Sequence, residues 1–269
     1  MKKDESDIKN QFNGFISTPL LWGGNDIAGL CQFDLKQTHE TPIDINKTPR
    51  LGKLTEQFVF HQLSKNINCQ VLIKNTQIQR DKITIGEIDC VLKQNEQIIH
   101  LEIIYKFYLY DNKAGEQELD KWVGPNKKDS LNQKLIKLKT KQLPRLFLPE
   151  SIKILNDHNL KVDNLIQQVN FKAQLFTPYS SEKIVFDTIN EKCVAGFYVN
   201  YKDLDQFKDN TFFVPQKLDW LSSPIKDKDY VDLNTFEKSI GRQIKESRSP
   251  LCWMKTTEKE YKKFFVVWW

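Results

Sequence analysis

The chain has 269 residues, of which 39% are hydrophobic, so it can bury a packed core, and a wholly disordered chain is excluded. Lys and Arg total 40 against 35 Asp and Glu, which leaves a net charge of +5. That charge is too small to identify a partner by itself. The length suits one large domain, or a core with an extension.

Cysteine spacing and the apolar runs bear on the cellular location. The five cysteines are scattered, and no two form a C-x-x-C pair, so we expect neither a structural zinc site nor a disulfide framework. The first residues lack the apolar run of a signal peptide. The longest apolar run, residues 264–269, is far too short to cross a membrane. We therefore expect a cytoplasmic protein that does not enter membranes.

The first half of the chain predicts two helices and three strands. Residues 7–17 have a helical pattern, and Thr48 and Pro49 predict the start of a second helix that runs to about Ser64. Three alternating patterns then follow in succession, and they predict strands over residues 69–79, 82–93 and 98–110. In the third strand, one apolar row is expected to face the core; it comprises Leu101, Ile103, Tyr105, Phe107 and Leu109.

Further along the chain, a helix is expected over residues 128–143 and a strand over 169–177. The order α-β-β-β-α-β predicts an α/β fold with a central mixed sheet flanked by helices. A doubly wound Rossmann pattern is not expected, because three strands come in succession. We expect residues 1–48 to pack on a core of 49–180, and residues 181–269 to form a mixed extension.

Carboxylates form the strongest candidate for a reactive site. If the second and third strands pair as a hairpin, Asp89 and Glu102 converge at the sheet surface, while Glu56 comes from the helix before them. Lys106 projects from the same strand face as Glu102. Carboxylate oxygens bind Mg²⁺, which activates water and neutralises a phosphate, so this set suits phosphodiester hydrolysis. The alternative is an ordinary solvated sheet face, although a glutamate inside so apolar a strand is costly to bury unless it is paired or binds metal.

Positive charge is concentrated in one segment. Residues 121–145 contain eight basic residues and only one acidic residue, Asp129, so the segment carries +7 and the rest of the chain carries −2. A lysine row beside an active site can follow a nucleic-acid backbone. The candidate contacts are Lys127, Lys128, Lys134, Lys137 and Lys141. The alternative is a solvated helix face in a lysine-rich chain, which has 35 Lys and 5 Arg.

Three further side chains are candidates for substrate contact. Trp122 and Asn126 flank a Gly-Pro turn just before the basic helix, and His100 lies two residues before Glu102. A lone tryptophan more often fills a core, so Trp122 also has that structural interpretation.

Several blocks resemble a known family. The runs LEIIYKFYLY (101–110) and KWVGPNKKDSLNQKL (121–135) are similar to the signature of an uncharacterised bacterial family, a domain of unknown function. That family is regarded as a member of the PD-(D/E)XK nuclease-like superfamily, which has the restriction-endonuclease fold. LGKLTEQFVFHQL (51–63) resembles its leading helix, and TIGEIDCVL (84–92) its acidic strand. The resemblance covers most of the chain.

The resemblance implies roles for individual residues. Glu56 matches the leading glutamate of the superfamily, Asp89 the metal-binding aspartate, and Glu102 the glutamate of the E-x-K pair. The usual lysine position is occupied by Ile104, and Lys106 lies two residues further along the same face. The carboxylates and the basic segment together predict a nuclease that uses Mg²⁺ or Mn²⁺ and acts on DNA or RNA.

Two alternatives remain open at this point. Loss of the lysine at position 104 is also compatible with a catalytically inactive protein that binds nucleic acid on the same fold. A protein-interaction module is the third possibility, with Trp220, Trp253, Trp268 and Trp269 as interface anchors unless they pack internally.

Overall fold

A computed structural model describes residues 5–23, 27–42, 45, 50–179 and 184–269. The proposed helix start at Thr48 and Pro49 lies outside these residues. The helices are α1 (Glu5–Ser17), α2 (Leu51–Ser64), α3 (Leu131–Lys137), α4 (Pro149–Asp157) and α5 (Leu233–Lys245). The strands are β1 (Cys69–Arg80), β2 (Ile83–Gln94), β3 (Gln97–Tyr110), β4 (Trp122–Val123), β5 (Leu165–Pro178), β6 (Val194–Asn200), β7 (Thr211–Phe213), β8 (Leu251–Lys255) and β9 (Tyr261–Val267).

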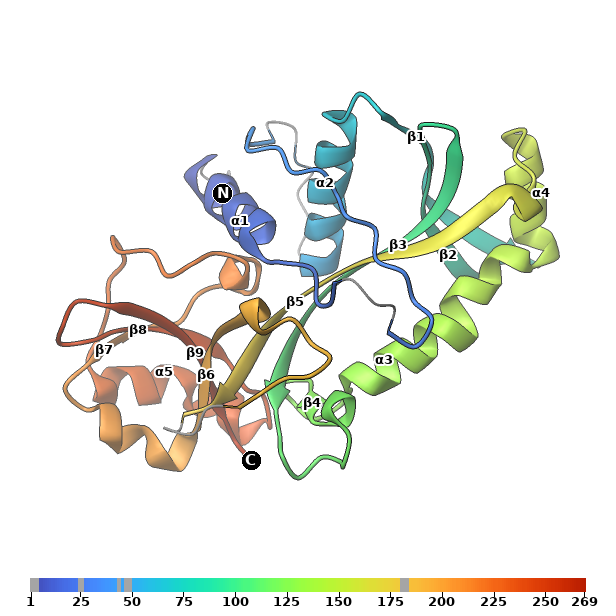
Figure 1. The fold of residues 1–269 in the computed structure, drawn as a ribbon. Helices are drawn as coiled ribbons and strands as arrows, with labels where there is room; N and C mark the ends of the chain where they lie inside the picture. The colour runs from blue at the N-terminus through green and yellow to red at the C-terminus, as the bar shows by residue number, and fades with distance from the viewer. Residues whose placement is uncertain (1–4, 24–26, 43–44, 46–49, 180–183) are drawn as a thin grey trace. The chain divides into compact units, whose positions relative to one another are not determined.

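The nine strands form a mixed sheet, and helices flank it (Figure 1). The strand order is β1-β2-β3-β5-β6-β9-β8-β7, with β4 paired to β3. The pairs β1–β2 and β2–β3 are antiparallel, whereas β5–β6 and β6–β9 are parallel. This confirms the predicted α/β class and central mixed sheet.

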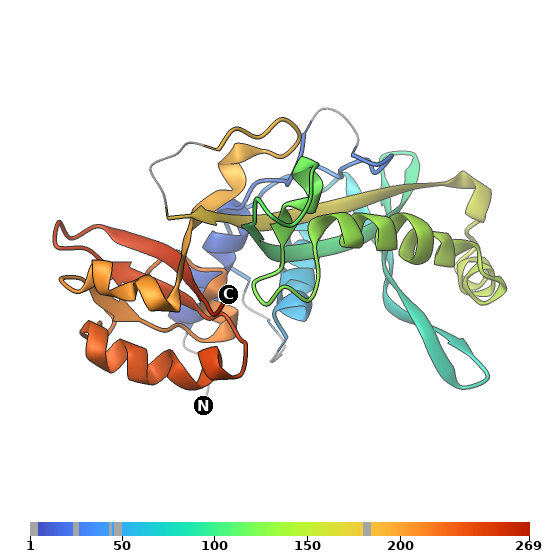
Figure 2. The ribbon, with the colours of Figure 1, turned by 90° about the horizontal axis from the view of Figure 1, so that it is seen from below.

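The chain divides into two compact units, each built from separate stretches of sequence. The first contains residues 1–19, 106–132 and 173–269, and the second contains 20–105 and 133–172. In the second unit, Figure 2 shows β1 and β2 as a projecting two-stranded ribbon. A hydrophobic core cluster joins these strands to the segments after β3: Ile73 of β1 and Ile88 of β2 belong to the same cluster as Leu146 and Leu155. In the first unit, α5 packs on the sheet of β7, β8 and β9 through Phe236 and Ile240.

Strand β3 is buried along both faces. Leu101, Tyr105, Phe107 and Leu109 belong to the predicted core row and are buried, but so are residues of the opposite face, including Glu102 and Tyr108. Ile103, the fifth residue of the predicted row, is only partly buried. Alternation in this strand therefore separates two packed faces and does not separate core from solvent. Glu102 is consequently placed in a dry environment.

The basic helix is shorter than predicted. Helix α3 ends at Lys137 and continues as a π-helical turn, Leu138–Gln142, and a 3₁₀ segment, Leu143–Phe147. Pro144 at the start of the 3₁₀ segment cannot donate a backbone hydrogen bond, so the regular helix cannot run through it. The predicted leucine stripe is nonetheless buried: Leu131, Leu135 and Leu138 are at most 1% exposed. In the described part of the chain, no helix is long and apolar enough to span a membrane.

Candidate active site

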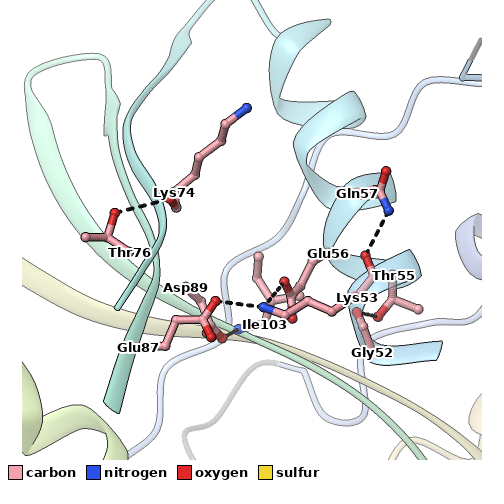
Figure 3. Close-up of polar contacts among 10 residues, drawn as sticks. All are labelled: Gly52, Lys53, Thr55, Glu56, Gln57, Lys74, Thr76, Glu87, Asp89 and Ile103. Atoms are coloured by element: carbon pink, nitrogen blue, oxygen red, sulfur yellow. Dashed lines mark hydrogen bonds and ion pairs between the residues drawn. The ribbon is translucent and has the colours of Figure 1, made fainter. Parts of the chain in front are cut away.

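Asp89 and Glu102 stand at the end of the β2–β3 ladder. Paired residues run from Gln94 and Gln97 at the turn to Cys90 and Leu101, so the predicted hairpin is confirmed. Asp89 and Glu102 are the next positions along the two strands. Beyond the ladder, the backbone N–H of Ile103 donates to Asp89 Oδ2 at 3.1 Å (Figure 3). A carboxylate thus occupies the place where the strand pairing stops.

Burial disfavours the charged forms of Asp89 and Glu102. Glu102 is only 2% exposed, and burial raises the pKa of its carboxyl to about 8, with the nearby charge of Asp89 acting in the same direction. Burial also raises the pKa of Asp89, against the hydrogen bond from Ile103, which lowers it. Two carboxyl groups with raised pKa values favour either a bound proton or a bound cation. The pair is therefore short of positive charge at neutral pH.

Helix α2 adds an ion-pair cluster to this site. Lys53 Nζ lies 2.8 Å from Glu56 Oε2 and 2.7 Å from Glu87 Oε1, so its ammonium bridges the helix and strand β2 (Figure 3). Burial lowers the pKa of Lys53, but the hydrogen bonds and charges of the two glutamates outweigh this and raise it. The pKa of Glu56 is raised, first by burial and then by Asp89 and Glu87, although Lys53 opposes this. Glu56 therefore belongs to the same electrostatic cluster as Asp89.

A hydrogen-bonded chain reaches Glu102 from the basic segment. Lys134 Nζ donates to Gln142 Oε1 at 2.6 Å, and Gln142 Nε2 donates to Glu102 Oε2 at 2.8 Å. The charges of Lys134 and Arg145 both lower the pKa of Glu102. Gly86 leaves room for Arg145, because a Cβ at Gly86 would lie 2.7 Å from Arg145 Cδ. One lysine of the predicted track thus faces the carboxylates.

His100 is held in one orientation next to this network. Gln167 Nε2 lies 2.9 Å from His100 Nδ1 and donates to the backbone oxygen of Leu143 at 2.8 Å. The other ring nitrogen, Nε2, is 3.8 Å from Glu102 Oε1. The ring is 2% exposed, and burial lowers its pKa to about 4, so it is neutral at physiological pH. His100 lies against the carboxylate site rather than on the surface.

Lys106 has a different partner from the one expected. Its Nζ lies 2.8 Å from Asp129 Oδ2, and both residues belong to the unit that does not contain Asp89 and Glu102. Gly124 makes room for this aspartate, because a Cβ there would meet Asp129 Oδ1 at 2.0 Å. Ile104, which stands where the resemblance implies a lysine, is 6% exposed. Lys53, in contrast, forms ion pairs with Glu56 and Glu87 beside Asp89.

The WVGPN block and the lysine that follows it contact Trp269. Trp269 Nε1 donates to the backbone oxygen of Pro125 at 3.1 Å, and Lys127 Nζ lies 3.7 Å from the centroid of the Trp269 ring. Lys127 also pairs with Asp111 at 2.6 Å. Asn126 Oδ1 accepts from the backbone N–H of Ser249 at 2.8 Å. These contacts give Asn126 and Lys127 structural partners within their own unit.

Tryptophan burial bears on two of the predictions. Trp122 is fully buried, and its ring packs edge-to-face on Tyr110. This agrees with the interpretation that Trp122 fills a core. Trp253 is also fully buried and Trp220 is 9% exposed, whereas Trp268 is 38% exposed. Two of the four proposed interface anchors, Trp220 and Trp253, therefore pack internally. Of the other predicted nucleic-acid contacts, Lys128, Lys137 and Lys141 are exposed.

Three residues of the site were missed from sequence: Lys53, Gln142 and Arg145. Lys53 had a detectable signal, because it lies three residues before Glu56 and therefore on the same helix face. Gln142 and Arg145 had none, because the π-helical turn sets which side chains of this segment face Glu102. Within the described residues, no group of three His, Cys, Asp or Glu side chains is arranged closely enough to hold a metal ion.

The comparisons with known proteins define a family and no activity. The family model of a domain of unknown function (DUF1853) matches residues 20–267. The chain therefore belongs to this family. The matched region includes the carboxylate site and the WVGPN block. No curated protein and no solved structure matches the chain.

Proposed function

We propose that this chain is a metal-dependent phosphodiesterase that acts on nucleic acid, with Asp89 and Glu102 as the primary ligands of Mg²⁺ or Mn²⁺. The observation that carries the proposal is the buried Asp89–Glu102 pair. Burial raises the pKa of both carboxyl groups, because it removes the water that would stabilise their charged forms. A bound cation would stabilise those charged forms instead. Hard cations prefer carboxylate oxygens, so the residues fit such an ion. A resemblance to the PD-(D/E)XK superfamily supports the same assignment.

The other side chains have defined tasks in this proposal. When bound, the metal ion supplies an activated water and neutralises charge on the scissile phosphate. Glu56 and Glu87 hold the Lys53 ammonium beside the carboxylates, where it can bind a phosphate oxygen or orient the attacking water. Gln142 fixes the orientation of Glu102. Lys134 and Arg145, which belong to the basic segment, add positive charge near Glu102.

Cleavage assays test the proposal directly. Labelled single- and double-stranded DNA and RNA are incubated with the protein in Mg²⁺ or Mn²⁺. We expect cleavage by wild type and a loss of about a hundredfold or more in Asp89→Asn, because this variant keeps an oxygen acceptor for Ile103 but loses the charge that holds the metal. Asp81→Asn in the β1–β2 turn is the matched control. Absence of cleavage in every arm, or full activity in Asp89→Asn, contradicts the proposal.

A second function is favoured by a specific observation. The usual lysine position holds the buried Ile104, and Lys106 is paired with Asp129. A protein that binds nucleic acid without cleaving it would show salt-dependent association, no requirement for metal and no turnover. The cleavage assay separates the two functions, since only the phosphodiesterase needs Asp89.

Both functions predict that the exposed lysines of the basic segment contact phosphates. We expect the double variant Lys137→Gln, Lys141→Gln to bind duplex DNA more weakly than wild type. The slope of log K against log salt should be smaller in magnitude by about 1.8, since each lost phosphate contact removes about 0.9. Fluorescence anisotropy over a salt series measures this. Lys226→Gln with Lys228→Gln changes the charge equally at two exposed lysines elsewhere and serves as the control. Equal slopes for all three proteins would exclude the lysine track.

A further inference from the structure

A separate cavity of about 380 Å³ lies in the unit that contains β6 and β9. It is lined by residues at the end of α1, at the starts of β6 and β9, in the loop 221–224, and by Gln174 of β5. Its volume falls in the range of small-molecule sites. None of its lining residues belongs to the carboxylate site, so this cavity is a distinct candidate site.

The charged residues that line the cavity are all positive. Three lysines, Lys192, Lys262 and Lys263, line the cavity, and none of the described lining residues is acidic. Lys262 is paired with Glu260 at 3.0 Å. Lys263 makes no ion pair with any described residue. The cavity therefore favours a ligand that carries negative charge.

Lys263 is a buried amine with neutral partners. It is 6% exposed, and its Nζ donates to Gln174 Oε1 at 2.8 Å and to the backbone oxygen of Trp220 at 3.0 Å. An ammonium has three protons, and these two bonds use two of them. Burial lowers the pKa of Lys263 to about 7, because no acidic side chain among the described residues offsets the desolvation. A bound anion would accept the third proton and supply the missing charge.

The amine is held on rigid elements. Gln174 Nε2 donates to the backbone oxygen of Leu221 at 3.2 Å, which directs its Oε1 toward Lys263. Strand β6 approaches the backbone of Lys263 so closely that a Cβ at Gly196 would lie 1.9 Å from the Lys263 oxygen. Glycine is needed at that position. The donor is thus positioned before any ligand arrives, which lowers the cost of binding.

We propose that this cavity binds a small organic phosphate monoester, with the Lys263 ammonium as the main contact of the phosphate group. A dianionic phosphate matches the excess of lysines better than a carboxylate does. The apolar part of the lining, which includes Phe197, Leu221 and Pro224, accommodates the carbon skeleton of the ligand. Lys192 adds positive charge around the phosphate, whereas Glu260 offsets the charge of Lys262.

Phenyl phosphate is a suitable probe, and isothermal titration calorimetry measures its binding to the full chain. Inorganic phosphate tests the head group alone, and benzoate tests a carboxylate in its place. We expect phenyl phosphate to bind more tightly than either, and Lys263→Met to weaken it at least about tenfold, since a charge-assisted hydrogen bond is lost. Lys259→Met, in the β8–β9 turn, should bind like wild type.

A second variant keeps the test decisive if Lys263→Met fails to fold. Ala195 lines the cavity, and Ala195→Phe should block it while leaving Lys263 in place. Loss of phenyl phosphate binding in this variant supports the proposal. Absence of binding to wild type at millimolar concentration, or equal affinity in Lys263→Met or Ala195→Phe, overturns it. Tighter binding of benzoate than of phenyl phosphate overturns the assignment of a phosphate.

Discussion

Glu102→Gln is expected to stabilise the metal-free protein at alkaline pH and to remove much of its pH dependence. The pKa of Glu102 is about 8 in the folded protein, above its ordinary 4.5, so the folded state binds the proton more tightly than the unfolded state. The stabilisation is complete below the unfolded pKa and is lost as pH rises through the folded one. Between pH 4.5 and 8 the wild type should lose on the order of 4 kcal/mol through this carboxyl.

Urea unfolding at pH 5.5 and 8.5 measures this effect. The neutral amide of the variant still accepts the hydrogen bond from Gln142, so its stability should change little across this range. Glu96→Gln changes a side chain that is 94% exposed and serves as the control. His100 acts in the opposite sense, because its lowered pKa costs stability as the pH falls toward 4. Parallel pH profiles for wild type and Glu102→Gln would contradict the prediction.

The same experiment bears on metal binding. At pH 8.5 a divalent cation should raise the unfolding midpoint of the wild type, because it replaces the proton that Asp89 and Glu102 lose. It should have little effect on Glu102→Gln, which keeps only one carboxylate of the pair. An equal response of both proteins to Mn²⁺ would place the metal elsewhere.

Lys53→Met is expected to reduce cleavage by about a hundredfold or more, because it removes a positioned charge beside the scissile phosphate. It should also tighten binding of Mn²⁺, since the ammonium that neutralises Glu56 and Glu87 is gone and the carboxylates gain more from a metal ion. A merely structural role for Lys53 would not produce this opposite change of affinity and rate. Calorimetry with Mn²⁺ and single-turnover cleavage measure the two effects.

Two companion variants make the result specific. Lys74→Met alters an exposed lysine of β1 that contacts none of the site carboxylates, and it should resemble wild type. Lys106→Met removes the partner of Asp129. If Lys106→Met abolishes cleavage while Lys53→Met does not, the sequence-based assignment of the lysine is correct and the proposal for Lys53 is wrong.

Local patterns predicted the first part of the fold because its contacts are local. Strands β2 and β3 form a hairpin across a four-residue polar turn, so alternation and spacing were enough to predict that Asp89 and Glu102 meet at its end. The leucine stripe of α3 was equally visible, because helical periodicity places Leu131, Leu135 and Leu138 on one face. Strand β8 and helix α4 were missed, because each is short and its apolar residues match no single period clearly.

By itself, the sequence determined the α/β class, the β2–β3 hairpin, and which carboxylates lie near the site, since all three depend on periodicity and short-range pairing. Only the tertiary structure decided which cation contacts them. Lys106 lies on the same strand as Glu102 but is drawn to Asp129, whereas Lys53 reaches Glu56 and Glu87 from a helix. Long side chains adopt the ion pair that is nearest in space, and that distance is set by the packing of helix on sheet, which residue spacing along one strand does not encode.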